Sequence, residues 1–155
     1  VTNNGGTPMR RAFDDVGQYF RLDKPWFDDP TQSTDTCKAC RQSFHIVMTD
    51  GYWKDTQATT ADARANVDAV DGEYIDNHNG GDRIRYVAER PYSDDSENTL
   101  SDVATYYWKN DLKPNINNKI ATSTADPAYW QHLPIFAISF GITGTLSPGT
   151  IFDEI

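Results

Sequence analysis

Two short apolar runs constrain the fold more than any other feature of the sequence. Residues 44–49 (FHIVMT) and 135–140 (IFAISF) are mostly apolar and contain β-branched and aromatic side chains, a pattern typical of strands buried on both faces. Buried strands of this kind belong to parallel sheets that helices cover. Two strands cannot complete such a sheet, so we expect further strands before Val1 or from a partner.

Two other segments have the periodicity of amphipathic helices. The spacing of apolar residues predicts a helix over 8–20, with Thr7 as its N-cap and Pro8 in the first helical position. A second helix is predicted after Thr99, because Thr99 and Asp102 have the spacing of a capping box, and it ends at Lys113 and Pro114. We interpret the polar stretch 52–96 as a long insertion and expect one helical turn at 127–130.

The order of these elements is helix, strand, insertion, helix and strand. This order fits right-handed crossovers in an open α/β sheet. The predicted fold is therefore an incomplete, Rossmann-like parallel sheet with flanking helices and a long polar insertion. The chain, 1–155, would form the C-terminal portion of a larger domain whose N-terminal half is missing.

The charge balance excludes some partners. The formal net charge is -9 and the basic residues do not cluster, which disfavours nucleic acid and anionic membrane surfaces. No apolar run has the length of a membrane-spanning helix, about 20 residues. We therefore expect neither a nucleic-acid partner nor a membrane span.

Ligands of open α/β sheets bind beyond the carboxyl ends of the strands, which here draws attention to Asp50. Taken singly, an Asp before a Gly is most often a turn residue, and Thr7 is explained as an N-cap. Taken together, Gly6-Thr7-Pro8 before a helix and Met48-Thr49-Asp50-Gly51 after a buried strand resemble a von Willebrand factor A domain. There, such a Thr and Asp belong to a metal-ion-dependent adhesion site.

Three longer blocks narrow this resemblance. They are 40–53 (CRQSFHIVMTDGYW), 98–112 (NTLSDVATYYWKNDL) and 126–132 (DPAYWQH), and in this order they resemble the PilC/PilY family of type IV pilus-tip adhesins and biogenesis factors. The resemblance implies a protein that is exported through the periplasm and works at the pilus tip or cell surface. It implies as partners the remainder of the parent polypeptide and pilus subunits or a host or surface receptor.

The resemblance also implies a cofactor. Thr7 and Asp50 would help to bind a divalent cation, Mg²⁺, Mn²⁺ or Ca²⁺, which prefers oxygen ligands. The third element of the family's site, Asp-x-Ser-x-Ser, is absent, and its nearest imitation at 94–98 lacks the second Ser. The site would thus be completed by residues outside this chain. Tyr52 and Trp53 follow Asp50 and Gly51 in the sequence and are candidate contacts for a protein partner or glycan.

Other residues have less specific interpretations. Cys37 and Cys40 form a C-x-x-C motif for which an exported location favours a disulfide, either between them or from one of them to the missing half. The acidic stretch 68–82 is read as a solvated loop rather than a Ca²⁺ loop, because it lacks EF-hand spacing. His45 is expected to be a hydrogen-bonded core histidine, and Tyr107 to pack in the core.

The leading hypothesis is a non-enzymatic, metal-dependent adhesion module of a pilus-tip protein. One alternative is a structural pilus-associated module with a vestigial metal site. The other is a metal-dependent hydrolase that uses Asp50 with a histidine. It rests on fold analogy alone, because the sequence has no nucleophile elbow, P-loop or His-Glu-x-x-His motif.

Overall fold

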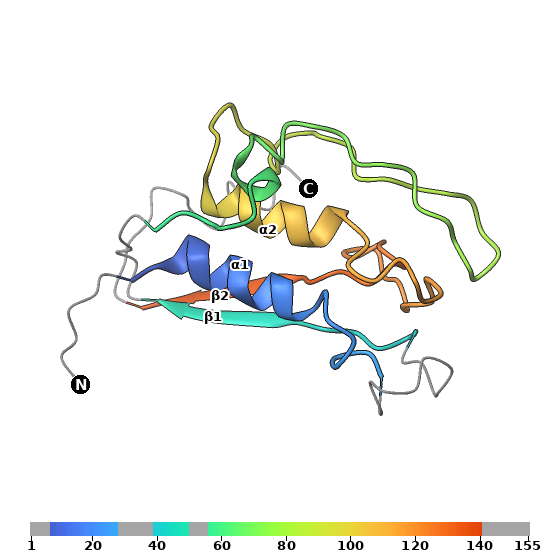
Figure 1. The fold of residues 1–155 in the computed structure, drawn as a ribbon. Coiled ribbons are helices and arrows are strands. Elements are labelled where there is room, and N and C mark those ends of the chain that lie inside the picture. The colour runs from blue at the N-terminus through green and yellow to red at the C-terminus, as the bar shows by residue number, and fades with distance from the viewer. Residues whose placement is uncertain (1–6, 28–38, 50–55, 141–155) are drawn as a thin grey trace.

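The computed structural model describes residues 7–27, 39–49 and 56–140. The described elements, in chain order, are α1 (Met9–Tyr19), β1 (His45–Thr49), the short 3₁₀ helix η1 (Asp62–Arg64), α2 (Leu100–Lys109) and β2 (Ile135–Ser139). Figure 1 shows α1 and α2 stacked on one side of the two strands, with the segment between η1 and α2 extending beyond the end of α2. No helix in these ranges is long and apolar enough to cross a bilayer.

β1 and β2 pair in parallel, as expected for a mixed α/β fold. His45 lies opposite Ile135 and Thr49 opposite Ser139. Both predicted strands are present, each shorter by one residue, since the observed strands are His45–Thr49 and Ile135–Ser139.

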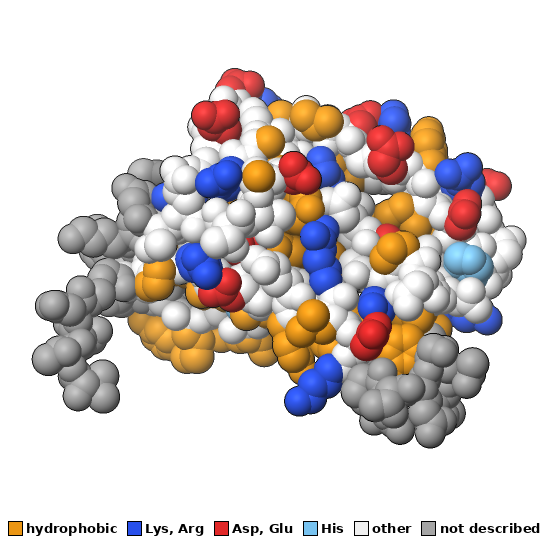
Figure 2. Space-filling view, viewed as in Figure 1, with side chains coloured by type: hydrophobic (Ala, Val, Ile, Leu, Met, Phe, Trp, Pro, Cys, Tyr) orange, Lys and Arg blue, Asp and Glu red, His pale blue; other side chains and the backbone are white. Residues whose placement is uncertain are grey.

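The prediction that both faces of the strands are buried is wrong among the described residues. Successive side chains of a strand point to opposite faces, and the helices cover only one face of this sheet. Six large apolar side chains on or beside the other face are 44–65% exposed, namely Phe44, Ile46, Met48, Phe136, Ile138 and Phe140. We call these six residues the open face. In Figure 2, hydrophobic side chains gather along the side of the molecule where the strands lie.

Helix α1 begins one residue later than predicted. Its N-cap is Pro8, no side chain caps it, and the Met9 N–H donates to the Thr7 carbonyl at 2.9 Å. The prediction that Thr7 is the N-cap is therefore wrong, because Pro8 occupies the capping position itself. The apolar face of α1 packs as expected, with Met9 and Phe13 both in the core.

Helix α2 confirms the predicted capping box. The Thr99 side chain accepts from the Asp102 N–H at 3.0 Å, and the Asp102 carboxylate accepts from the Thr99 N–H at 2.8 Å. Asp102 is fully buried, and its second oxygen accepts from the Val67 N–H at 2.7 Å. The helix ends at Lys109 rather than at 113, because Asn110 is already extended. One carboxylate thus starts the helix and fixes part of the insertion to it.

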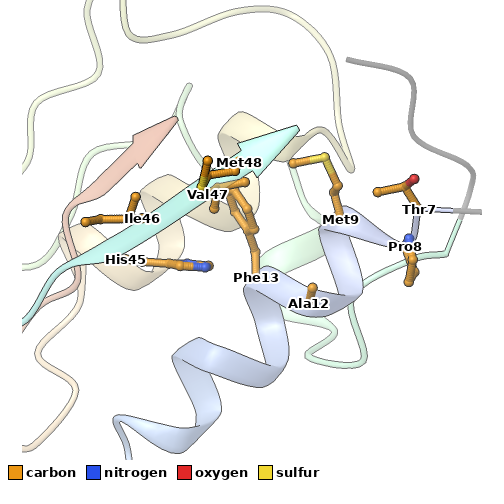
Figure 3. A pocket seen from close by; sticks show the side chains of 9 residues that line it. All are labelled: Thr7, Pro8, Met9, Ala12, Phe13, His45, Ile46, Val47 and Met48. Atoms are coloured by element: carbon orange, nitrogen blue, oxygen red, sulfur yellow. The ribbon is translucent and has the colours of Figure 1, made fainter. Parts of the chain in front are cut away.

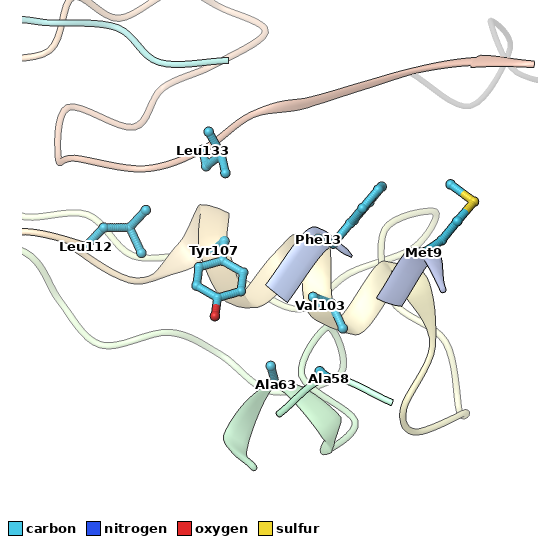
Figure 4. Packing of buried hydrophobic residues seen from close by; sticks show 8 residues of the cluster. All are labelled: Met9, Phe13, Ala58, Ala63, Val103, Tyr107, Leu112 and Leu133. Carbon is cyan, nitrogen blue, oxygen red and sulfur yellow. The ribbon is translucent and has the colours of Figure 1, made fainter. Parts of the chain in front are cut away.

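The main core extends from the covered face of the sheet, around the two helices, to the segment of η1 (Figure 4). Its buried members are Met9, Phe13, Ala58, Ala63, Val103, Tyr107, Leu112 and Leu133. Tyr107 is fully buried, as expected. Gly17 of α1 lies against its ring, and a Cβ on Gly17 would come within 2.4 Å of the ring carbons. The two helices can approach this closely only because position 17 has no side chain.

The segment between η1 and α2 is held by few backbone pairs and by one tyrosine. A single antiparallel bridge joins Ile75 and Ile84. The Tyr129 hydroxyl donates to the Ile75 carbonyl at 2.7 Å and accepts from the Ile84 N–H at 2.9 Å. The expected helical turn at 127–130 is absent, since Ala128, Tyr129 and Trp130 are buried in a non-helical segment. Long-range contacts outweigh local propensity at this point.

Candidate functional site at the carboxyl end of β1

A groove of about 230 Å³ lies between the start of α1 and β1 (Figure 3). It is lined by Thr7, Pro8, Met9, Ala12, Phe13, His45, Ile46, Val47 and Met48. Thr7 precedes α1, while Met48 and Thr49 end β1 and are followed in the sequence by Asp50. The groove therefore brings the chain segment that carries Thr7 to the strand end that leads into Asp50.

Thr7 itself fits a ligand role in one respect. Its side chain is exposed, and within the described ranges no hydrogen bond occupies its hydroxyl. A free hydroxyl at this position can bind a hard cation directly or through water. The described residues contain no group of three or more His, Cys, Asp or Glu that could hold a metal ion. The described part of the chain thus offers one oxygen ligand and no complete metal centre.

His45 lies at the start of β1 and lines the groove. Its ring packs edge-on against Phe13, with 4.8 Å between the ring centroids, and burial lowers its pKa. Its Nδ1 atom is buried and has no hydrogen-bond partner among the described residues. The prediction of a hydrogen-bonded core histidine is therefore wrong for this atom, and the groove contains an unsatisfied polar group instead.

The other two histidines hold loops together. The Nδ1 atom of His78 accepts from the Asn118 N–H at 3.0 Å. The ring nitrogens of His132 lie 2.9 Å from an Asp126 carboxylate oxygen and 2.6 Å from the Trp130 carbonyl oxygen. Neither His78 nor His132 lines the groove, so neither is placed there to assist Asp50 in hydrolysis.

The carboxylates of the acidic stretch 68–82 bind to other protein groups and are not arranged around a common cavity. Asp71 forms an ion pair with Arg85 at 2.6 Å, and Asp76 forms one with Arg83 at 3.0 Å. Asp68 is buried, and its carboxylate accepts from the Ser101 hydroxyl at 2.8 Å. These carboxylates have separate protein partners, so they do not converge on one point.

Several predicted site residues lie outside the described ranges. These are Asp50, Tyr52, Trp53 and Cys37. Cys40 is described as an exposed free thiol. The roles predicted for these five residues, including the disulfide, stay predictions.

Comparison with known proteins supplies the missing context. The chain is 31% identical over 162 residues to the type IV pilus biogenesis factor PilY1 of Pseudomonas aeruginosa strain PAK, a match that covers 92% of the chain. The same factor from strain PAO1 is 31% identical over 163 residues, and that from strain UCBPP-PA14 is 29% identical over 161 residues.

The chain is a distant homologue of part of PilY1. It spans 13% of the length of the PilY1 proteins that it matches. No family model matches the chain, and no solved structure does.

The groove and the open face of this PilY1 homologue were not predicted from the sequence. Alternation along β1 was the available signal, since the even-numbered residues 44, 46 and 48 are exposed and the odd-numbered residues are half-buried. The large apolar side chains all belong to the even-numbered set, whereas the odd-numbered set is His45, Val47 and Thr49. Composition therefore favoured burial of the face that the structure leaves exposed.

Proposed function

We propose that the chain is the C-terminal portion of a von Willebrand A-like domain in a PilY-type pilus protein. In this proposal it is a non-enzymatic, metal-dependent module for adhesion and protein binding at the tip of a type IV pilus, exported through the periplasm. The observation that carries the proposal is the match to PilY1 over most of the chain. The exposed Thr7 beside the carboxyl end of β1 supports it.

The metal site of this proposal uses few carboxylates. Thr7 would bind Mg²⁺, Mn²⁺ or Ca²⁺ directly or through water, and Asp50 through a hydroxyl or water, with the remaining ligands supplied from outside this chain. When most of its ligands are neutral oxygens, the positive charge of the cation is less fully neutralised than it would be by several carboxylates. It can then take a carboxylate from a partner as its last ligand.

Recognition would also involve side chains near the metal. Tyr52 and Trp53 follow Asp50 in the sequence and would contact a pilus subunit or a receptor on a host or other surface. Aromatic side chains often dominate the free energy of such interfaces. The rest of the parent polypeptide is the third partner in this proposal.

Thermal unfolding of the parent protein tests the metal site. At a Mg²⁺ or Mn²⁺ concentration of about 100 times the Kd, binding stabilises the folded state by about 2.7 kcal/mol. We expect the cations to raise the Tm of the wild type, and to leave that of Asp50→Ala unchanged. Thr7→Ala should reduce the shift. Asp95→Ala and Thr122→Ala, at exposed positions, are the matched controls and should respond like the wild type. Equal Tm values in cation and in EDTA would contradict the proposal.

A structural role without metal is the second candidate. The segment between η1 and α2 exposes Val70, Tyr74, Val87 and Tyr92, each 52–59% accessible, which could pack against other parts of a pilus-associated assembly. In that case the metal site is vestigial. Partner binding that persists in EDTA but is lost in Tyr74→Ser and Tyr92→Ser would favour this role over the first.

A further inference from the structure

The segment between η1 and α2 reverses its direction near residue 80, at its far end (Figure 1). We call residues 76–81 the tip. The Gly80 N–H donates to the Asn77 carbonyl at 3.3 Å, which closes a turn, and the Asn79 N–H donates to the Asn77 side-chain oxygen at 2.9 Å. Gly80 has a φ of 87°, which residues with a side chain rarely adopt. The turn therefore places a glycine directly after an asparagine.

Asn79 and Gly80 are both open to solvent. Each is exposed, and apart from its chain neighbours no described atom lies within 4 Å of the position that a Cβ on Gly80 would take. Within the described residues the side-chain amide of Asn79 has no hydrogen-bond partner, since its one hydrogen bond is made by the backbone N–H. The side-chain carbonyl carbon of Asn79 and the backbone nitrogen of Gly80 are thus both accessible.

Two other asparagines of the chain are protected. The side-chain amide of Asn66 donates to the Asp94 carbonyl at 3.2 Å. The backbone nitrogen that follows Asn66 belongs to Val67, whose β-branched side chain crowds it, and its N–H donates to the Asp102 carboxylate at 2.7 Å. Asn118 is only 4% exposed. Asn79 therefore differs from both in its neighbour, its exposure and its free side-chain amide.

We propose that Asn79 is a site of spontaneous deamidation, and that one product loosens the tip from the rest of the fold. The backbone nitrogen of Gly80 loses its proton to water and attacks the side-chain carbonyl carbon of Asn79. The bond from this carbon to the side-chain nitrogen breaks, and the nitrogen takes up a proton and leaves as ammonia. Water then adds to either carbonyl of the resulting five-membered imide and opens it to aspartate or isoaspartate. Both products carry an additional negative charge.

The two products should differ in their effect on the tip. The Asn118 N–H donates to Nδ1 of His78 at 3.0 Å, and the Asn118 side chain donates to the Asp76 carbonyl at 3.1 Å, so one buried residue fastens the tip. Aspartate leaves the backbone path unchanged. In isoaspartate the path runs through the side chain and is longer by one carbon, so the nitrogen of Gly80 no longer faces the Asn77 carbonyl. This change displaces His78 next to it. The inference depends neither on a metal nor on a partner.

Peptide mapping of the parent protein, aged at about pH 8, tests the reaction. The urea-unfolded protein under the same conditions supplies the reference rate. We expect the folded protein to convert Asn79 within about tenfold of this reference, because the one hydrogen bond of the Gly80 N–H that must break is worth at most about 1.4 kcal/mol, a factor of ten. Asn66 in the same folded sample should remain an amide. No conversion of Asn79 in the folded protein, or equal conversion of Asn66, would overturn the proposal.

Hydrogen exchange at the Asn118 amide tests the effect on the tip. We expect the isoaspartate form, separated by chromatography, to exchange this amide about tenfold faster than fresh protein, because the bond to His78 is weakened. Asn79→Asp is the matched control for the added charge and should exchange like fresh protein. Aged Asn79→Gln, which cannot form the five-membered imide, should also be unchanged. Equal exchange in the isoaspartate form and in Asn79→Asp would overturn the second part of the proposal.

Discussion

The hydroxyl of Tyr107 donates a buried hydrogen bond to the Asp14 carboxylate at 2.7 Å, which joins α2 to α1. The other oxygen of Asp14 accepts from the backbone N–H groups of Thr59 and Thr60 at 2.7 and 3.1 Å. One fully buried carboxylate thus fixes three segments: the two helices and the chain before η1.

Asp14 should make the domain sensitive to acid. Burial by itself raises the pKa of this carboxyl, but hydrogen bonds from Thr59, Thr60 and Tyr107 outweigh burial and hold the pKa well below its usual range. A lowered folded-state pKa stabilises the protein above the unfolded-state pKa, near 4, and this stabilisation is lost as the pH falls toward the folded-state value. Urea unfolding between pH 7 and pH 3 measures it.

In Asp14→Asn, the amide N–H₂ cannot accept the hydrogen bonds that the carboxylate oxygens accept. We expect a loss of about 2–3 kcal/mol at pH 7 and a smaller dependence of stability on pH. Asp15→Asn, on the exposed side of α1, is the matched control. An unchanged pH dependence in Asp14→Asn would show that the carboxylate is not held ionised as described.

Gly17 should not tolerate a methyl group. In Gly17→Ala the new Cβ would overlap the Tyr107 ring, and the helices would have to separate. Overpacking costs about 1–3 kcal/mol, whereas alanine gains about 1 kcal/mol in helix propensity, so we expect a small net destabilisation. Gly81→Ala is the control, because its Cβ meets only the flexible end of Asn77. Thermal unfolding compares the two variants, and a Gly17→Ala as stable as wild type would contradict the close packing.

Lys109 should hold the start of the insertion against α2. Its ammonium group donates to the carbonyls of Val67 and Val70 at 2.7 and 2.8 Å, and burial lowers its pKa. In Lys109→Met both carbonyls lose their partner, so we expect faster hydrogen exchange and proteolysis around 67–72 and a loss of about 1–3 kcal/mol. Lys119→Met, at an exposed position, should change neither. Unaltered protection of 67–72 would exclude this role.

His132 should keep the pKa of Asp126 low. The two atoms that its ring nitrogens face, the Asp126 carboxylate oxygen and the Trp130 carbonyl oxygen, can only accept hydrogen bonds. Burial raises the pKa of Asp126, but the hydrogen bond and charge of His132 outweigh burial and lower it. In His132→Gln we therefore expect a rise in the pKa of Asp126, which an NMR titration of its carboxyl carbon measures. An unchanged pKa of Asp126 in this variant would contradict the role of His132.

The sequence predicted those parts of the fold that local patterns determine. The capping box of Thr99 and Asp102 and the two apolar strands were recognised because each signal lies within a few residues. The capping role predicted for Thr7 was wrong. A Pro near the start of a helix can be its N-cap or its first helical residue, and the local sequence does not distinguish these two positions. Only one face of β1 is covered by the described helices. Which faces are covered depends on elements far from β1 in the sequence, so the local pattern cannot predict it.

Long-range contacts account for most of what the sequence could not reveal. The extended path of Tyr129 follows from hydrogen bonds to Ile75 and Ile84, more than forty residues away. The unpaired Nδ1 atom of His45 depends on the position of α1. For the candidate site, the sequence drew attention to the carboxyl end of β1, and the structure adds the groove and the exposed Thr7. The role of Asp50 stays a prediction.

The path of the chain has a mechanical consequence. The described chain enters the fold at Thr7 and leaves it after Phe140, and both residues lie at the carboxyl end of the strands, where the Phe140 N–H donates to the Thr49 carbonyl. A pulling force along the polypeptide would therefore act at one end of the sheet. It would separate β2 from β1 one hydrogen bond at a time, beginning at Phe140, instead of shearing all of the bonds together. The sheet would thus open at low force and could re-form when the tension is released.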